Sequence, residues 1–169
     1  FSDSSAKAFS MRDWQDFKTF ESGDGLKIIP HLHPIMHSSR YSFTIFPNTV
    51  IPLGSSGFPV LLFFPIDVGH THLRIFHYGL TNEDEEIEEK WANRISAFGK
   101  IIDEDIANLA PIQNSMESLF YKGLPLSYQE RRIWYMHETI DKNIGIEAIP
   151  NHLRVNQLLE PFIENPTNI

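Results

Sequence analysis

Residues 85–110 read EEIEEKWANRISAFGKIIDEDIANLA, and this stretch decides the fold. Apolar side chains recur in it at steps of three or four residues, at Ile87, Trp91, Ile95, Phe98, Ile102, Ile106 and Leu109. That spacing is typical of a helix with one apolar face. The acidic residues from Glu83 to Glu89 favour a helix start here, because negative side chains interact well with the positive end of the helix dipole. The stretch therefore predicts one long amphipathic helix, which Pro111 should kink or interrupt because it has no N–H to donate.

The sequence before Thr81 is typical of strands and turns. Five strands are predicted, over residues 15–21, 26–33, 41–46, 60–66 and 70–78. The run from Val60 to Ile66 is apolar throughout, which indicates a strand buried on both faces. Short loops between the strands imply antiparallel neighbours.

Helical patterns fill the sequence after the long helix. The apolar pattern continues to Phe120 and ends at the Gly123-Leu124-Pro125 segment. Ser127 and Glu130 predict a capping box, followed by a helix to about residue 143, with Gly145 as its stop. The predicted inner face of that helix consists of Ile133, His137, Ile140 and Ile144. A further helix is predicted after Pro150 or Asn151, and Pro161 and Pro166 end it.

Strands followed by helices predict an α+β fold, in which an antiparallel sheet has helices against one face. We expect a single domain over residues 1–169, strand-rich over 14–80 and helical over 83–164.

Composition excludes several classes of protein. The chain has 169 residues, with 14 Lys+Arg against 22 Asp+Glu and a net charge of −8, and no basic cluster, which argues against a nucleic-acid partner. No apolar run approaches the roughly 18 residues of a membrane-spanning helix. The absence of cysteine excludes disulfides and Cys-ligated metal centres, and it fits a reducing compartment, so we expect a cytoplasmic location. The chain starts at Phe1 without a signal-peptide pattern, so we expect a fragment or a processed chain.

Asp105 is the sharpest candidate for chemistry. It interrupts an apolar row whose other members are Phe98, Ile101, Leu109 and Ile112. A carboxylate in an apolar row is costly unless it is paired or binds a metal ion. The alternative is that Asp105 lies at the edge of the row and reaches water or an arginine such as Arg131 or Arg132.

The histidines offer a weaker metal site. His31 and His33 share one strand face, with His37 four residues beyond, and His70 and His72 form a second alternating pair. Such pairs can bind zinc, iron or copper. They are equally compatible with exposed strand positions in a chain that has eight histidines.

Three stretches, taken in order, resemble one family. They are TIFPNTV at 44–50, DEDIANLAPIQ at 103–113, and GLPLS at 123–127 followed by Glu130, Ile133 and His137. Together they are similar to the C-terminal half of the catalytic domain of Rieske-type aromatic ring-hydroxylating oxygenases, in the large (alpha) subunit.

The resemblance implies a helix-grip fold of the START type, an antiparallel sheet gripping a long C-terminal helix. It implies that Asp105 is the catalytic carboxylate ligand of a mononuclear Fe(II) that activates O2 to hydroxylate an aromatic ring, as in the catabolism of aromatic hydrocarbons. Asn108 and Gln113 would hydrogen-bond around that ligand. Phe98, Ile101 and Leu109 would line the substrate pocket. The expected strand residues of its wall are Phe43, Ile45, Leu62, Phe64, Leu73 and Ile75.

The family also implies groups that this sequence lacks. Its Rieske [2Fe–2S] domain uses cysteines, and its iron histidines lie in a D-x-x-H-x-x-x-x-H segment that does not occur here. We therefore expect a domain truncated at its N-terminus that retains no iron and is inactive alone. The complete protein would use a reductase or ferredoxin and form a homotrimer. The sequence leaves open monooxygenation, dioxygenation and demethylation.

A second hypothesis is a non-enzymatic helix-grip domain that binds a small apolar ligand. The same architecture serves unrelated functions, so fold alone does not choose between the two.

Overall fold

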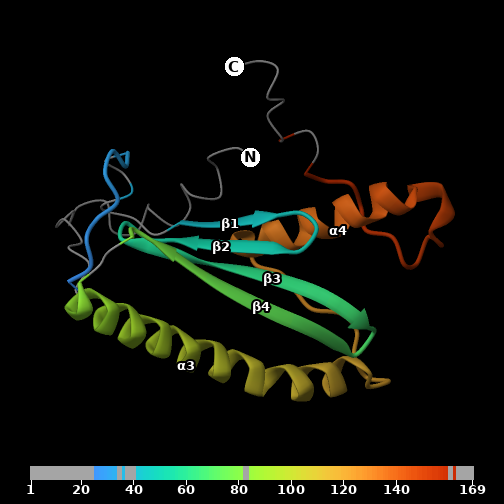
Figure 1. Ribbon diagram of the computed structural model, residues 1–169. Helices are drawn as coiled ribbons and strands as arrows, with labels where there is room; N and C mark the ends of the chain where they lie inside the picture. The colour runs from blue at the N-terminus through green and yellow to red at the C-terminus, as the bar shows by residue number, and fades with distance from the viewer. Residues whose placement is uncertain (1–24, 34–35, 37–40, 82–83, 160–161, 163–169) are drawn as a thin grey trace. The chain divides into compact units, whose positions relative to one another are not determined.

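The computed structural model describes residues 25–33, 36, 41–81, 84–159 and 162 (Figure 1). The described residues up to Gly123 belong to one compact unit, and those from Leu124 onward belong to another. The predicted strand at 15–21 lies outside the described residues. The prediction of a single catalytic domain stays a prediction.

The first unit contains a four-stranded antiparallel sheet. Its strands, in spatial order, are β1 (Tyr41–Ile45), β2 (Thr49–Leu53), β3 (Gly57–Asp67) and β4 (His70–Gly79). An antiparallel sheet combined with helices confirms the α+β class. The strands predicted at 41–46, 60–66 and 70–78 are present as β1, β3 and β4.

One predicted strand is absent, and one strand that was not predicted is present. Residues 26–33 form no strand, because His31 has a left-handed φ of 62° and a turn occupies this stretch. In contrast, β2 is present where no strand was predicted, and it contains Pro52. Its described pairing with β3 covers only Thr49 and Val50, so Pro52 lies where the β3 side of β2 needs no N–H donor.

Burial of β3 is one-sided rather than two-sided, which corrects a further prediction. Gly57, Pro59 and Leu61 are buried, whereas Val60 and Leu62 between and beside them are half-buried. From Phe63 outward the strand is exposed, since it extends past β2 and pairs only with β4. The far end of the β3–β4 hairpin is therefore open, and Val68 at its turn is 98% exposed.

The long helix, α3 (Glu85–Met116), has the predicted start. The Asp84 side chain caps it by accepting a hydrogen bond from the backbone N–H of Glu86. Pro111 does not interrupt it, since the helix continues for five residues beyond and loses only one backbone hydrogen bond. The helix then ends at Met116, so Phe120 is not helical and is 89% exposed.

The first half of α3 contacts the sheet through two aromatic side chains. The indole of Trp91 lies over Gly57 and Gly79, and the ring of Phe98 meets the ring of His77 edge-on at 5.7 Å between centroids. These partners and the buried positions of β3 share one side of the sheet, because directly paired residues point to the same face. Figure 1 shows α3 running along the β3–β4 part of the sheet.

The second unit begins with the predicted capping box. The backbone N–H of Ser127 donates to Glu130 at 2.7 Å, and a 3₁₀ turn, η1 (Tyr128–Glu130), leads into α4 (Arg131–Ile144). Helix α4 ends at Ile144 and is capped by Gly145, whose φ of 97° suits glycine and whose N–H donates to the carbonyl of Asp141. A second 3₁₀ turn, η2 (Ile146–Ala148), follows.

Helix α4 buries a different face from the one predicted. Glu138 and Asp141 are its buried residues, whereas Ile133, His137 and Ile144 are exposed. The helix predicted after Pro150 is also wrong, since turns and irregular chain occupy residues 151–159. The reason is that the backbone N–H groups of Val155, Leu158 and Leu159 donate to the carboxylates of Asp141 and Glu138.

Among the described residues, no helix combines the length and the apolar character that crossing a bilayer requires.

Candidate functional site

Asp105 lies on the row of α3 that meets the sheet. It follows Phe98 by seven residues and Trp91 by fourteen, which are two and four helical turns. Because Trp91 and Phe98 both contact β3 or β4, the same face of α3 carries Asp105 about 10 Å further along the axis than Phe98. The sequence periodicity that singled out this carboxylate therefore agrees with the contacts of the helix.

Asp105 is exposed, together with every other residue of α3 from Asp103 to Ile112. The apolar residues of its row are exposed to a similar degree, at 56% for Ile101 and 58% for Leu109. Exposure in this half of α3 thus does not separate the apolar face from the polar face. The pocket of Phe98, Ile101 and Leu109 stays a prediction, and of the three only Phe98 is half-buried, against His77.

The predicted wall residues of the strands do not share one face. Leu73 and Ile75 alternate with His77 and lie on the α3 side of the sheet. The strand register places Phe43, Ile45, Leu62 and Phe64 on the opposite side. Leu61 and Phe63, paired with Ile75 and Leu73, take their place on the α3 side.

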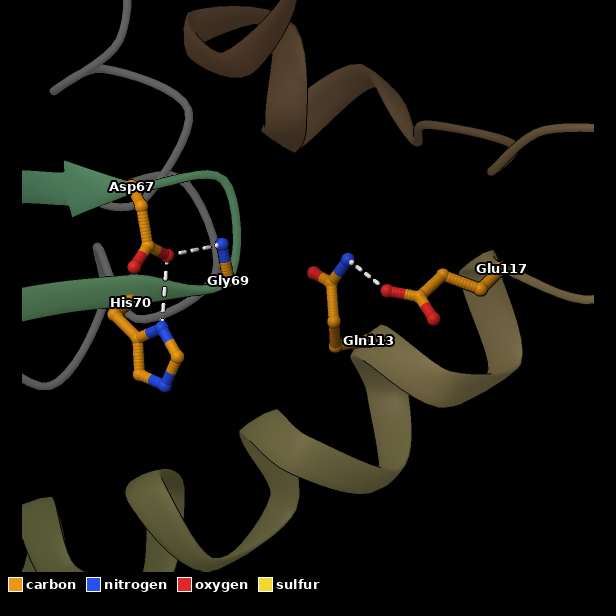
Figure 2. Close-up of polar contacts among 5 residues, drawn as sticks. All are labelled: Asp67, Gly69, His70, Gln113 and Glu117. Carbon is orange, nitrogen blue, oxygen red and sulfur yellow. Dashed lines mark hydrogen bonds and ion pairs between the residues drawn. The ribbon is translucent and has the colours of Figure 1, made fainter.

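The two predicted partners of the carboxylate hydrogen-bond to residues of α3 or its C-cap. Asn108 donates from Nδ2 to the carbonyl of Glu104 at 3.0 Å, and Gln113 donates from Nε2 to Oε1 of Glu117 at 3.1 Å. Neither bond involves Asp105. Figure 2 shows the Gln113–Glu117 pair at the C-terminal end of α3. Their role around a metal ligand stays a prediction.

The open end of the β3–β4 hairpin has its own polar cluster (Figure 2). Oδ1 of Asp67 accepts from the backbone N–H of Gly69 and is 2.8 Å from Nδ1 of His70. The hydrogen bond with His70, followed by that with Gly69, lowers the pKa of the Asp67 carboxyl below its ordinary value. This arrangement stabilises a turn and has too few ligands for a metal.

The histidine metal sites gain no support. In the part of the chain that the structure describes, no group of three His, Cys, Asp or Glu side chains converges to hold a metal ion. His37, which the first site required, lies outside the described residues.

One small pocket lies at the start of α3. Its lining consists of Leu26, Lys27, Ser56, Leu80, Thr81, Ile87 and Trp91. Trp91 is about 20 Å along the helix axis from Asp105, so this pocket is not the predicted substrate site.

Comparison with protein families decides the assignment. A family model described as the ring hydroxylating alpha subunit (catalytic domain) matches residues 3–146. The chain belongs to this family. That confirms the resemblance found in the three sequence stretches, each of which lies inside the matched range, and places the chain among ring-hydroxylating oxygenases. The alternative of a non-enzymatic binding domain is not favoured.

Searches of curated proteins and of solved structures gave no match.

Sequence reasoning missed two sets of residues. Arg94 was not singled out, although a cation three residues after Trp91 on an apolar face was a usable signal. Glu138 and Asp141 were overlooked because an acid on a helix usually indicates a solvated face.

Proposed function

We propose that this chain forms part of the catalytic domain of a non-haem iron oxygenase that activates O2 to hydroxylate an aromatic or related ring. The observation that carries the proposal is the place of Asp105 on the sheet-facing row of α3, inside the range matched by the family model. On this proposal Asp105 is the carboxylate ligand of the iron, and the sheet and α3 belong to a helix-grip fold.

The donor type of Asp105 fits one ligand of such an iron. A site of two histidines and one carboxylate leaves positions open on Fe(II) for O2, which is the chemistry that the metal supplies when bound. The described residues provide the carboxylate, but in them no group of three His, Cys, Asp or Glu side chains converges to complete a metal site. The two histidines would therefore come from outside the described residues, and we propose that this chain alone retains no iron.

The apolar residues around Asp105 suit a ring-shaped substrate. Phe98, Ile101 and Leu109 share the sheet-facing side of α3, and Leu73 and Ile75 line the facing side of β4. Apolar side chains around a few polar groups are typical of small-molecule sites. On this proposal, a Rieske [2Fe–2S] centre served by a reductase or ferredoxin delivers the electrons. The complete protein forms a trimer and is located in the cytoplasm.

The test compares two neighbouring acids in the iron-loaded protein that carries this chain. Asp105→Ala should lower the bound iron by about tenfold or more and abolish substrate hydroxylation, because it removes a direct ligand. Glu104→Ala, on the polar side of the same turn, is the matched control and should leave both unchanged. Iron content measured by mass spectrometry decides the matter: wild-type iron in the Asp105→Ala protein would refute the assignment.

A further inference from the structure

The first half of α3 is fastened to the sheet by one compact cluster, which we call the Trp91 junction: Ser56, Gly57, Gly79, Trp91 and Arg94. The Trp91 indole lies so close to both glycines that a Cβ at Gly57 would be 2.5 Å from Cη2 and a Cβ at Gly79 would be 1.9 Å from Cζ2. Only glycine leaves room for the indole at these two positions.

Arg94 of α3 adds hydrogen bonds to the chain at the start of β3. Its Nη1 donates to Oγ of Ser56 at 2.7 Å, and its Nη2 donates to the carbonyl of Gly57 at 2.8 Å. Its guanidinium also lies 5.1 Å from the centre of the Trp91 ring. A planar guanidinium that donates from two nitrogens fixes direction as well as distance, which a lysine ammonium does not.

The rotation of α3 about its axis matters greatly for Asp105. A carboxylate lies about 6 Å from the axis of its helix, so a rotation of about 20° moves it by about 2 Å. Metal–ligand distances tolerate only about 0.2 Å. No described residue of α3 is buried, and the Trp91 junction, together with the ring contact of Phe98 with His77, joins its first half to the sheet.

We propose that Arg94 is a positioning residue for Asp105: by holding Ser56 and Gly57 it sets the rotation of α3, and thereby aims the carboxylate eleven residues later. This inference rests on the proposed function of Asp105 as an iron ligand. The helix is continuous between the two residues, so a rotation at Arg94 is transmitted to Asp105 over about three turns.

The first arm of the test measures helix rotation without iron. The chain contains no cysteine, so Phe43→Cys on β1 and Ala107→Cys on α3 give two unique sites for nitroxide spin labels. Arg94→Met in this labelled chain should shift or broaden the spin–spin distance distribution by about 2 Å, the displacement that a rotation of about 20° produces at this radius. Arg74→Met is the matched control, since Arg74 lies over the Phe64 ring on the face of the sheet away from α3. An unchanged distribution in Arg94→Met overturns the inference.

Ser56→Ala is the milder variant, should Arg94→Met fail to fold. It removes the hydrogen bond between Arg94 and the Ser56 hydroxyl but keeps the one to the Gly57 carbonyl, and it should move the distribution in the same direction by a smaller amount. Arg94→Lys should restore the distance only in part.

The second arm measures iron in the protein that carries this chain. Arg94→Met should weaken iron retention by about tenfold, the usual effect of losing a group that orients a ligand, while the helical circular dichroism is kept. If the label moves but iron is retained, while Asp105→Ala loses iron, the positioning role is wrong and the proposed function stands. If Asp105→Ala also retains iron, the proposed function itself has failed.

Discussion

Gly79→Ala should destabilise the protein, although adding a methyl group at a glycine usually does the opposite. The new Cβ would lie 1.9 Å from Cζ2 and 2.6 Å from Cη2 of Trp91. Gly79 is not among the glycines with a positive φ, so the cost is steric rather than a matter of backbone strain. The indole cannot slide aside freely, because Gly57 confines it too. Overpacking against a rigid ring costs about 1–3 kcal/mol, and we expect the upper part of that range.

Urea unfolding followed by circular dichroism measures this change in the free energy of unfolding. Gly99→Ala is the matched control: a Cβ there would have no heavy atom within 4 Å, and alanine in a helix interior is favoured over glycine by about 0.5–1 kcal/mol. The two substitutions should therefore have opposite signs. In a Trp91→Leu background the penalty of Gly79→Ala should largely vanish. A stable Gly79→Ala protein, or a penalty that persists without the indole, would refute the steric account.

Three further changes can be tested in the same way. Glu138→Ala should lower the free energy of unfolding by about 2–4 kcal/mol, because two backbone N–H groups lose their acceptor. Glu147 is exposed, so the control Glu147→Ala should change the free energy of unfolding by less than about 0.5 kcal/mol. Burial, and then the charge of Arg94, lower the pKa of His77 below 6.5. The unfolded chain therefore binds a proton more readily than the folded protein, and the free energy of unfolding should fall as the pH drops through 6.5. His77→Asn should remove that step from a pH series of melting temperatures. The hydrogen bonds with the Ser127 backbone and side chain lower the pKa of Glu130 below 4.5. Its contribution to stability is therefore full above pH 4.5 and is lost as the pH falls below that value. Glu130→Gln should flatten the acid side of the curve of melting temperature against pH, and an unchanged curve would contradict the capping role.

The helices and caps of this chain are predictable because their signals are local. The start of α3, the capping box at Ser127 and the stop at Gly145 each depend on residues within one turn, and all three are present. The row of Asp105 is predictable for the same reason, since helical periodicity fixes which residues share a face.

Features that depend on partners distant in the sequence were harder to predict. The strand β2 contains a proline, and only its limited pairing with β3 makes that proline acceptable. The wall of the predicted pocket mixed two faces of the sheet, because alternation shows which residues share a side but not which side meets the helix. The segment after Pro150 has a helical pattern, yet its backbone N–H groups bind the carboxylates of α4 instead.

Proline is the residue that the segment 155–159 should resist most strongly. Its contacts with α4 use main-chain atoms: three N–H groups donate to Asp141 and Glu138, and the carbonyl of Asn156 accepts from the Trp134 indole. Side chains in this segment are therefore free to vary in sequence among relatives without loss of attachment. A proline at 155, 158 or 159 removes a donor outright, so natural variation here should be broad in chemistry but exclude that residue at those three positions.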